Sequence, residues 1–327
     1  MARQKILYTD TGMKDVDIER LILSKAGIDL VTATSTDPET LIIEGAECDG
    51  IMVEYAEIDK EILDAWGSKG KVKIVCRQGI GYNNINIDAA SNNKIMVSNV
   101  PDYCLEEVAD HTIGLVLNLV RQINILDNRV KGGDFSEIPP RPIHRIRGQK
   151  FCLYGFGNIA KAVAIRAQAF GFEVYAYDPN IAIEDFELHK VKNVSTLEDL
   201  AAIADVLTIH VPSIESTFHT IDSNILNKMK RNSIIINTAR GSIVNEKNII
   251  DALNDGVIFG AGLDVFEGEP LQQDNPLTGM ENVILTPHIS WNSEEAEMDL
   301  RVKIAENIVL ALTEGKPRNF INKEAFK

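Results

Sequence analysis

Short runs of apolar and β-branched residues alternate with amphipathic stretches from the beginning of the chain. Five runs have the length of one strand each: "KILYTD", "IDLVTAT", "CDGIMVE", "KVKIVCRQG" and "KIMVSNV". Helical segments separate them, the first near residues 16–26, and this alternation is typical of a parallel sheet covered by helices. The pattern predicts a first βα domain that ends near Pro101.

The same alternation starts again at Phe151, with "FCLYGFG", "FEVYAYD", "DVLTIHVP", "SIIINTAR", "IFGAGLDVF" and "NVILTPH". Residues 293–315 then have the spacing of one amphipathic helix that runs towards the end of the chain, and we expect it to return to the first domain. The sequence thus predicts an α/β protein with two doubly wound parallel-sheet domains, residues 1–100 with 293–327 and residues 101–292. We expect the chemistry to take place in a cleft between them.

Between the two series, residues 104–131 predict one long helix that is stopped by Gly132 and Gly133. Apolar residues cover more than one of its faces: Ile113, Leu115, Val116, Leu117, Leu119, Val120 and Ile123. Such a helix must be buried on several sides, either by its own domains or by another subunit. We expect a homodimer that forms through helix 104–131.

Composition narrows the class of protein. The 327 residues include 45% hydrophobic and 25% charged residues, which is typical of a globular protein. The net charge of −15 argues against a nucleic-acid surface and against binding to anionic membranes. No apolar run approaches the ~20 residues of a membrane span and no long apolar segment opens the chain, so we expect a cytoplasmic protein. The cysteines are Cys48, Cys76, Cys104 and Cys152, and they lack CxxC spacing. Their spacing indicates neither a zinc site nor a disulfide framework, so we expect no metal.

A glycine-rich loop, "YGFGNIA", follows one strand and precedes a helix. Gly155 permits the tight turn, and Gly157 lets the backbone approach a pyrophosphate at the helix N-terminus. Ala160 takes the third glycine position. Asp178 ends the next strand, where a carboxylate accepts hydrogen bonds from a ribose 2′-hydroxyl and repels a 2′-phosphate. An ordinary βα turn with a chance acid is the alternative, but strand, loop, helix and acid in this order favour a site for NAD over NADP.

Three side chains at strand ends have the chemistry of carbonyl reduction. Arg240 closes "SIIINTAR", Glu269 follows "GLDVFEGE", and His288 closes "NVILTPH". An imidazolium can protonate a carbonyl oxygen, a carboxylate behind it favours the charged ring, and an arginine can hold a substrate carboxylate. Each residue alone is more often structural, but together beside a dinucleotide loop they favour catalysis. No comparable acid follows the strand of His210, which we interpret as structural or cofactor-side.

Four segments resemble the D-isomer-specific 2-hydroxyacid dehydrogenases: "LYGFGNIAKAVAIRAQAFGFEVYAYDP", "NTARGSIVNE", "GLDVFEGEP" and "LTPHISW". The resemblance covers nearly the whole chain and implies a Rossmann NAD domain, a flavodoxin-like substrate domain, and interconversion of a D-2-hydroxy acid and its 2-oxo acid. It implies that Arg240 orients the substrate, that His288 is the acid/base and that Glu269 is its partner. Asp264 would hold the nicotinamide carboxamide. The residues implied along the dinucleotide are Thr112, Gly155, Gly157, Asn158, Ile159, Asp178, Val211, Pro212, Thr238, Ala239, Arg240, Asp264 and His288.

The segment "RQGIGYNNINI" resembles the substrate loop of this family, with the amides of Ile80 and Gly81 facing the substrate carboxylate. The family usually has Asp where this chain has Asn83 and Asn86, and Gly where it has Ala160. These departures affect the detail of the loops and not the type of reaction.

Within the family, the chain most resembles the C-terminal-binding-protein branch, through "RIRGQ", "AVAIRAQAFGF", Arg77 in "CRQGIG" and Trp291 after "PHIS". Animal members of that branch are NAD(H)-responsive transcriptional corepressors, so the alternative function is a dinucleotide-gated binding scaffold with incidental turnover. The chain ends soon after its last predicted helix without a disordered tail for partners, which favours the enzyme.

Substrate identity depends on a few side chains. Arg77 and Trp291 are candidate substrate contacts, although Trp291 is equally explained as a packing residue at the start of the last helix. An indole in the pocket favours apolar 2-oxo acids over phosphate-bearing ones. Phosphoglycerate and hydroxypyruvate or glyoxylate are the alternative substrates. The basic segment consists of Arg141, His144, Arg145 and Arg147. It could touch a phosphate, but a solvated loop is the favoured interpretation.

Overall fold

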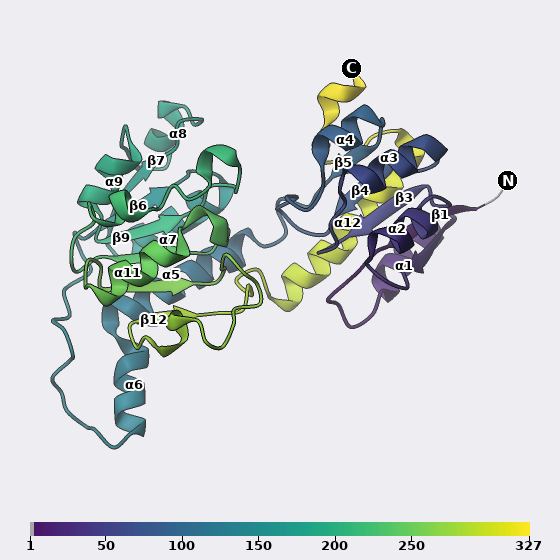
Figure 1. The fold of residues 1–327 in the computed structure, drawn as a ribbon. Helices are drawn as coiled ribbons and strands as arrows, with labels where there is room; N and C mark the ends of the chain where they lie inside the picture. The colour runs from purple at the N-terminus through teal and green to yellow at the C-terminus, as the bar shows by residue number, and fades with distance from the viewer. Residues whose placement is uncertain (1–2) are drawn as a thin grey trace. The chain divides into compact units, whose positions relative to one another are not determined.

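The computed structural model describes residues 3–327, which divide into two compact units (Figure 1). One unit comprises the chain up to Tyr103 together with Ser293–Lys327, and the other comprises Cys104–Asn292. Each unit is built on one sheet in which all strands are parallel. The predicted α/β class with two parallel sheets is therefore confirmed.

The first unit has a five-stranded sheet in the order β2-β1-β3-β4-β5. Its strands are β1 (Gln4–Tyr8), β2 (Ile28–Thr32), β3 (Gly50–Val53), β4 (Ile74–Arg77) and β5 (Met96–Ser98). Its helices are α1 (Asp17–Lys25), α2 (Pro38–Gly45), α3 (Lys60–Lys69), α4 (Ile87–Asn92), α12 (Glu294–Glu314) and the short 3₁₀ helix η4 (Lys323–Phe326). One face of the sheet packs against α2, α3 and α4, and the opposite face packs against α1 and α12.

A buried ion pair joins α12 to α1. The guanidinium of Arg301 donates from Nε to Oε1 of Glu19 and from Nη2 to Oε2, both at 2.9 Å, and Nη2 also contacts Asp15 at 2.7 Å. Glu19 has no exposed surface, and the side chain of Arg301 is 5% exposed. Buried charges are stable only when they are paired, so this ion pair fixes α12 against α1.

The second unit has a seven-stranded sheet in the order β12-β11-β10-β9-β6-β7-β8. Its strands are β6 (Lys150–Tyr154), β7 (Glu173–Tyr177), β8 (Lys192–Asn193), β9 (Val206–Ile209), β10 (Ile234–Asn237), β11 (Gly260–Leu263) and β12 (Val283–Leu285). The chain leaves β6 for β7 and β8 on one side and returns to β9 on the other. In such sheets this reversal opens a ligand crevice at the carboxyl ends of the two central strands.

Helices cover both faces of this sheet. They are α5 (Leu105–Arg121), α6 (Ile123–Lys131), α7 (Asn158–Ala169), α8 (Ile183–Leu188), α9 (Leu197–Ile203), α10 (Ser223–Leu226) and α11 (Glu246–Asn254), with the 3₁₀ turns η1 (Glu215–Thr217), η2 (Gly241–Ile243) and η3 (Pro276–Gly279). The short edge strand β8 has no counterpart in the sequence pattern described above.

The predicted single helix over 104–131 is wrong, because the chain breaks at Gln122 between α5 and α6. Gln122 has a φ of 55°, and its buried side chain donates from Nε2 to the carbonyl of Arg141 at 3.0 Å. Asn118 accepts a hydrogen bond from the N–H of Asn124 at 2.9 Å and so holds the start of the new helix. Side-chain bonds to the backbone of this kind favour a turn over a continuous helix.

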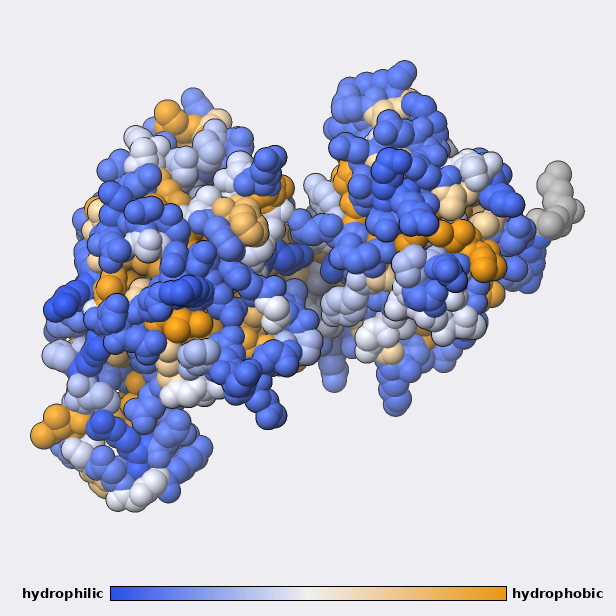
Figure 2. All heavy atoms as spheres, in the orientation of Figure 1, coloured by the Kyte–Doolittle hydropathy of each residue, from blue (hydrophilic) through white to orange (hydrophobic). Residues whose placement is uncertain are grey.

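The apolar residues of α5 pack in the core of their own unit. Ile113, Leu115, Val116 and Leu119 are buried in a core with α7 and the sheet. Ile123, by contrast, is 54% exposed at the start of α6. In Figure 1, α6 extends away from the rest of its unit, and Figure 2 shows hydrophobic surface on the same projecting region.

Candidate active site

The glycine loop after β6 has the geometry that its sequence requires. Gly155 has a φ of 94°, and a Cβ there would lie 2.8 Å from the backbone of His210. Gly157 is the N-cap of α7 and makes no side-chain cap bond, and a Cβ added to it would meet no atom of the described residues within 4 Å. The packing of the protein therefore explains Gly155 but not Gly157, whose lack of a side chain leaves room for a ligand at the helix N-terminus.

Asp178 lies directly after β7, next to this loop. Its Oδ2 accepts a hydrogen bond from the N–H of Phe156 at 2.9 Å, and its Oδ1 accepts one from Asn180 at 2.9 Å. The carboxylate thus also fixes the shape of the glycine loop. Its contact with a ribose stays a prediction.

The loops after β9 and β10 carry the other residues expected beside the dinucleotide. Val211 and Pro212 follow β9, and Thr238 and Ala239 follow β10. In α5, the hydroxyl of Thr112 lies 3.1 Å from that of Thr238 and donates to the carbonyl of its own helix. The structure therefore brings Thr112 to the carboxyl end of β10.

Arg240 lies in a turn shaped by Asn237, a buried residue that the sequence analysis did not single out. The amide of Asn237 donates to the carbonyl of Arg240 at 2.9 Å, and its oxygen accepts from the N–H of Ala239 at 3.0 Å. The next residue, Gly241, lies so close to Phe266 that an added Cβ would be 1.9 Å from its carbonyl. The turn after β10 therefore packs directly on the backbone of the loop after β11.

Glu269, in the loop after β11, meets His288, in the loop after β12. Nδ1 of His288 lies 2.7 Å from Oε2 of Glu269, and the two side chains are 35% and 37% exposed, so a ligand can reach them. Burial raises the pKa of the Glu269 carboxyl, but the hydrogen bond and charge of His288, the N–H of Phe266 and the charge of Arg240 together hold it below its usual range. The carboxylate is therefore charged at neutral pH and faces the imidazole.

Asp264 is fully buried and holds the loop that carries His288. Its oxygens accept hydrogen bonds from the hydroxyl of Thr286 at 2.6 Å and from the N–H groups of Ile289 and Ser290 at 2.9 Å. Since Thr286 gives its one proton to Asp264, the contact of 3.0 Å between Thr286 and Nε2 of His111 requires that this nitrogen donates. Contact of Asp264 with a carboxamide stays a prediction.

Two further histidines lie in the loops at this edge of the sheet. Desolvation lowers the pKa of His210 to about 3, so its ring is neutral and contacts the hydroxyl of Thr208 at 2.9 Å. His219 pairs with Glu267, two residues before Glu269, at 2.6 Å. This second pair was not predicted, because no local sequence pattern links His219 to Glu267.

Arg77, Ile80 and Gly81 belong to the first unit, where they lie at and after the end of β4. The Nε of Arg77 is buried without a hydrogen-bond partner, and within residues 3–327 the N–H groups of Ile80 and Gly81 have no acceptor. Asn86 caps α4 by accepting from the N–H of Ala89 at 2.9 Å. Unpaired donors at strand ends suit an anionic ligand, and their role towards substrate stays a prediction.

Trp291 is half-buried and lies three residues after His288, just before Ser293, the N-cap of α12. Both of its possible functions, packing at the helix start and forming a wall beside the substrate, agree with this position.

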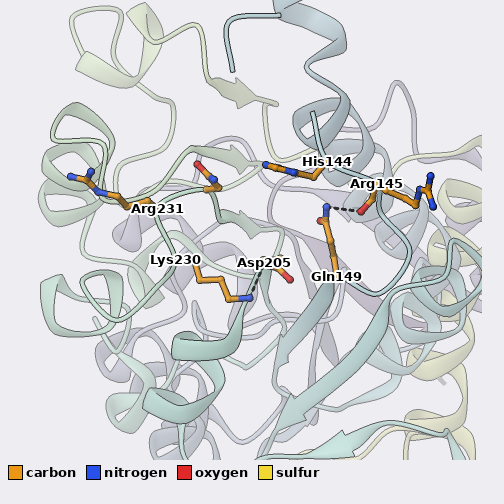
Figure 3. Close-up of a pocket in the computed structure, with 7 residues that line it drawn as sticks. His144, Arg145, Gln149, Asp205, Lys230 and Arg231 are labelled. Atoms are coloured by element: carbon orange, nitrogen blue, oxygen red, sulfur yellow. Dashed lines mark hydrogen bonds and ion pairs between the residues drawn. The ribbon is translucent and has the colours of Figure 1, made fainter. Parts of the chain in front are cut away.

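The basic segment lies at the other edge of the sheet. Figure 3 shows a pocket of about 490 Å³ there, lined by His144, Arg145, Gln149, Asp205, Lys230, Arg231 and Asn232. Gln149 and Asp205 directly precede β6 and β9, so the pocket adjoins the amino ends of the strands, opposite the loops described above. The guanidinium groups of Arg145 and Arg231 point away from each other at its two ends. The segment thus does not reach the loops that carry Arg240 and His288 in its own unit.

Among the described residues, no group of three or more His, Cys, Asp or Glu side chains is arranged to hold a metal ion. Over the same residues, no helix has the length and apolar character to cross a membrane.

Residues 113–290 match the family model of the D-isomer specific 2-hydroxyacid dehydrogenase NAD binding domain. A glyoxylate reductase from Korarchaeum cryptofilum is 34% identical over 306 residues, which cover 92% of this chain and 91% of that protein. The chain belongs to the D-isomer specific 2-hydroxyacid dehydrogenase family. As a member of this family it is an NAD-dependent oxidoreductase, so the resemblance seen in the sequence is confirmed.

Other similar proteins have different names. A D-3-phosphoglycerate dehydrogenase from Archaeoglobus fulgidus is 36% identical over 302 residues, but the chain spans only 56% of its length. A crystal structure of D-lactate dehydrogenase from Aquifex aeolicus with NAD and lactic acid has a TM-score of 0.87 and 27% identity, and the match covers 97% of this chain and 99% of that one. The names of these relatives state different substrates, and the D-lactate dehydrogenase shares the fold of this chain. The likeness to the C-terminal-binding-protein branch stays a prediction.

Proposed function

We propose that the protein interconverts a D-2-hydroxy acid and its 2-oxo acid by hydride transfer with NAD. The 2.7 Å contact between His288 and Glu269 carries this proposal. The two residues lie in loops beside the Arg240 turn, on the same sheet edge as the glycine loop. A titratable ring with a carboxylate behind it and a cation nearby is the set of groups that carbonyl reduction needs.

The residues of the second unit fit NAD. The positive φ of Gly155, the open space at Gly157 and the uncapped N-terminus of α7 form a cradle for a pyrophosphate. When bound, NAD supplies the hydride donor or acceptor. Asn158 and Ile159 would lie beside its phosphates and Asp178 beside its ribose.

The remaining chemistry belongs to the side chains of this protein. Because Nδ1 of His288 faces Glu269, Nε2 is the ring nitrogen that would exchange a proton with the substrate oxygen. The charge of Glu269 favours the protonated ring and fixes its orientation. Arg240 would hold the substrate carboxylate and polarise the adjacent carbonyl, with Arg77 and the amides of Ile80 and Gly81 as further anion contacts.

We propose uncharged 2-oxo acids with short or apolar side chains as substrates, with Trp291 as a wall of the pocket. The place of Trp291, three residues after His288, supports this proposal, whereas the similarity to a glyoxylate reductase along nearly its whole length supports glyoxylate, the alternative without a side chain.

The test is a panel of 2-oxo acids with NADH, followed at the nicotinamide absorbance, with the His288→Ala variant as the control. We expect turnover of several acids by the wild type and its loss in the variant. Tight NADH binding without turnover of any 2-oxo acid would exclude this function and favour the NAD(H)-responsive scaffold.

A further inference from the structure

The loops that carry Arg240 and Glu269 are joined by a second histidine–carboxylate pair. His219 lies after η1 with a φ of 51°, and its Nε2 lies 2.6 Å from Oε1 of Glu267. Its Nδ1 lies 3.3 Å from the side-chain amide of Asn245, at the end of the Arg240 turn. The ring therefore bridges the loop after β10 and the loop after β11.

The backbone around His219 is paired with the same turn. The N–H of His219 donates to the carbonyl of Ser242 at 2.9 Å, and Ile221 forms a parallel bridge with Val244. The hydroxyls of Ser213 and Ser242 lie 2.7 Å apart. The segment that follows Val211 and Pro212 is thus laid along the turn that begins at Arg240.

Glu267 is bound from two directions. Besides His219, its Oε1 accepts from the N–H of Glu246 at 3.0 Å, and its own N–H donates to Oε2 of Glu246 at 3.2 Å. The side chain of Glu267 thus contacts both the ring of His219 and the backbone of Glu246, and the reciprocal bonds between Glu267 and Glu246 join the loop after β11 to the start of α11. The pair therefore keeps an acidic loop packed against the Arg240 turn.

We propose that His219 and Glu267 are positioning residues that hold Arg240 in place relative to Glu269 and His288. The proposal rests on the proposed function of Arg240. Neither side chain needs to touch substrate: the geometry acts through the Gly241–Phe266 contact, where the two loops meet backbone to backbone. A displaced Arg240 grips the substrate carboxylate less well, so the loss should fall mainly on substrate binding.

The test compares Glu267→Ala and His219→Ala with two controls. Glu267→Gln keeps an oxygen that can accept from His219 and from Glu246. His189→Ala removes another histidine–carboxylate pair of similar exposure. His189 contacts Asp185 of α8, and its ring packs against Phe156 in the glycine loop, so it contacts neither the loop after β10 nor the loop after β11.

For the two alanine variants we expect kcat/KM to fall about tenfold, mainly through a higher KM for the 2-oxo acid and with unchanged NADH affinity. Glu267→Gln should restore most of the loss, and His189→Ala should keep the wild-type KM for the 2-oxo acid. Hydrogen exchange of residues 240–245 and 266–269 should accelerate in the alanine variants alone.

Unchanged KM in both alanine variants, or an equal loss in His189→Ala, would overturn the proposal. If the wild type reduces no 2-oxo acid, the proposed function fails, and the exchange rates alone then decide whether the pair holds the two loops together. Equal hydrogen-exchange rates in the wild type and all four variants would show that the pair does not hold the two loops together.

Discussion

At the scale of single residues, we expect His288 to transfer the proton and Glu269 to stabilise the protonated ring. Because the pKa of Glu269 is held below its usual range, the carboxylate is charged at neutral pH and favours the protonated imidazole. The Glu269→Gln variant removes that charge, so the pH above which reduction declines should fall and turnover at neutral pH should slow. His288→Ala should lose at least about 10²-fold in kcat while still binding NADH. A pH–rate profile and an NADH titration measure both effects, and near-normal turnover of His288→Ala would contradict the assignment.

Asp178 has two functions that a pair of variants separates. Asp178→Asn keeps an acceptor for the glycine loop but removes the charge that repels a 2′-phosphate, so use of NADPH should rise while use of NADH persists. Asp178→Ala also loses the bond to Phe156, so NADH binding itself should weaken. We expect the NADH to NADPH ratio of kcat/KM to fall about tenfold or more in either variant. Equal use of NADPH by the wild type would refute the preference.

Trp291 is the residue through which substrate choice can be tested. If its indole covers apolar substrate side chains, Trp291→Ala should lower kcat/KM about tenfold for apolar 2-oxo acids and much less for glyoxylate, which has no side chain to bury. The wild type should prefer these substrates to phosphohydroxypyruvate. The measurement is kcat/KM across the series for both proteins. Should phosphohydroxypyruvate prove best, Arg77 becomes the candidate phosphate ligand, since the basic segment lies at the far edge of its sheet.

Residue patterns predicted the strand ends well and the contacts between loops poorly. Gly155, Arg240 and His288 each follow a clear apolar run, so their place at one edge of a parallel sheet follows from local pattern. The bonds of Asn237 to the Arg240 turn and of His219 to Glu267 depend on how the chain returns through space. No periodicity of the sequence encodes these contacts. The same holds for the hydrogen bonds that Asp264 accepts from Thr286 and Ser290.

At the scale of elements, the break between α5 and α6 shows how a side chain can override helix propensity. Residues 118–124 have no glycine or proline, so the pattern predicted continuity. The buried Gln122 and the capping Asn118 supply alternative partners for the backbone, and a second helix begins at Ile123. Such caps are visible from the sequence only when the turn itself is already suspected.

The anchoring of α12 by Arg301 gives a prediction about stability. Arg301→Leu should lower the free energy of unfolding by about 3–5 kcal/mol, because it leaves Glu19 charged and fully buried. The double variant with Glu19→Leu should recover much of the loss, since it removes both charges. Chemical denaturation of the three proteins measures this difference. Equal stability of the single variant and the wild type would show that the pair contributes nothing.

At the scale of the whole molecule, the exposed apolar surface that favours a dimer lies on α6 and the loop after it, and not on α5. The apolar residues of α5 fill the core of their own unit, so they do not require a partner. The projecting α6 and the loop after it expose four large apolar side chains, Ile123, Val130, Phe135 and Ile138, at 54%, 52%, 84% and 76%. Apolar surface gathered on one projecting region is typical of a self-complementary interface.

We therefore expect a homodimer that forms through α6 and the following loop. Light scattering at micromolar concentration should give about twice the chain mass of 36.2 kDa. The double variant Phe135→Asp and Ile138→Asp should shift the protein towards the monomer, because charges in a dehydrated interface are costly. Leu188→Asp is the matched control, since Leu188 is 78% exposed in the same unit but lies on α8. A monomeric wild type would contradict the expected dimer. If Leu188→Asp also dissociates the dimer, the interface does not lie on α6 and the following loop.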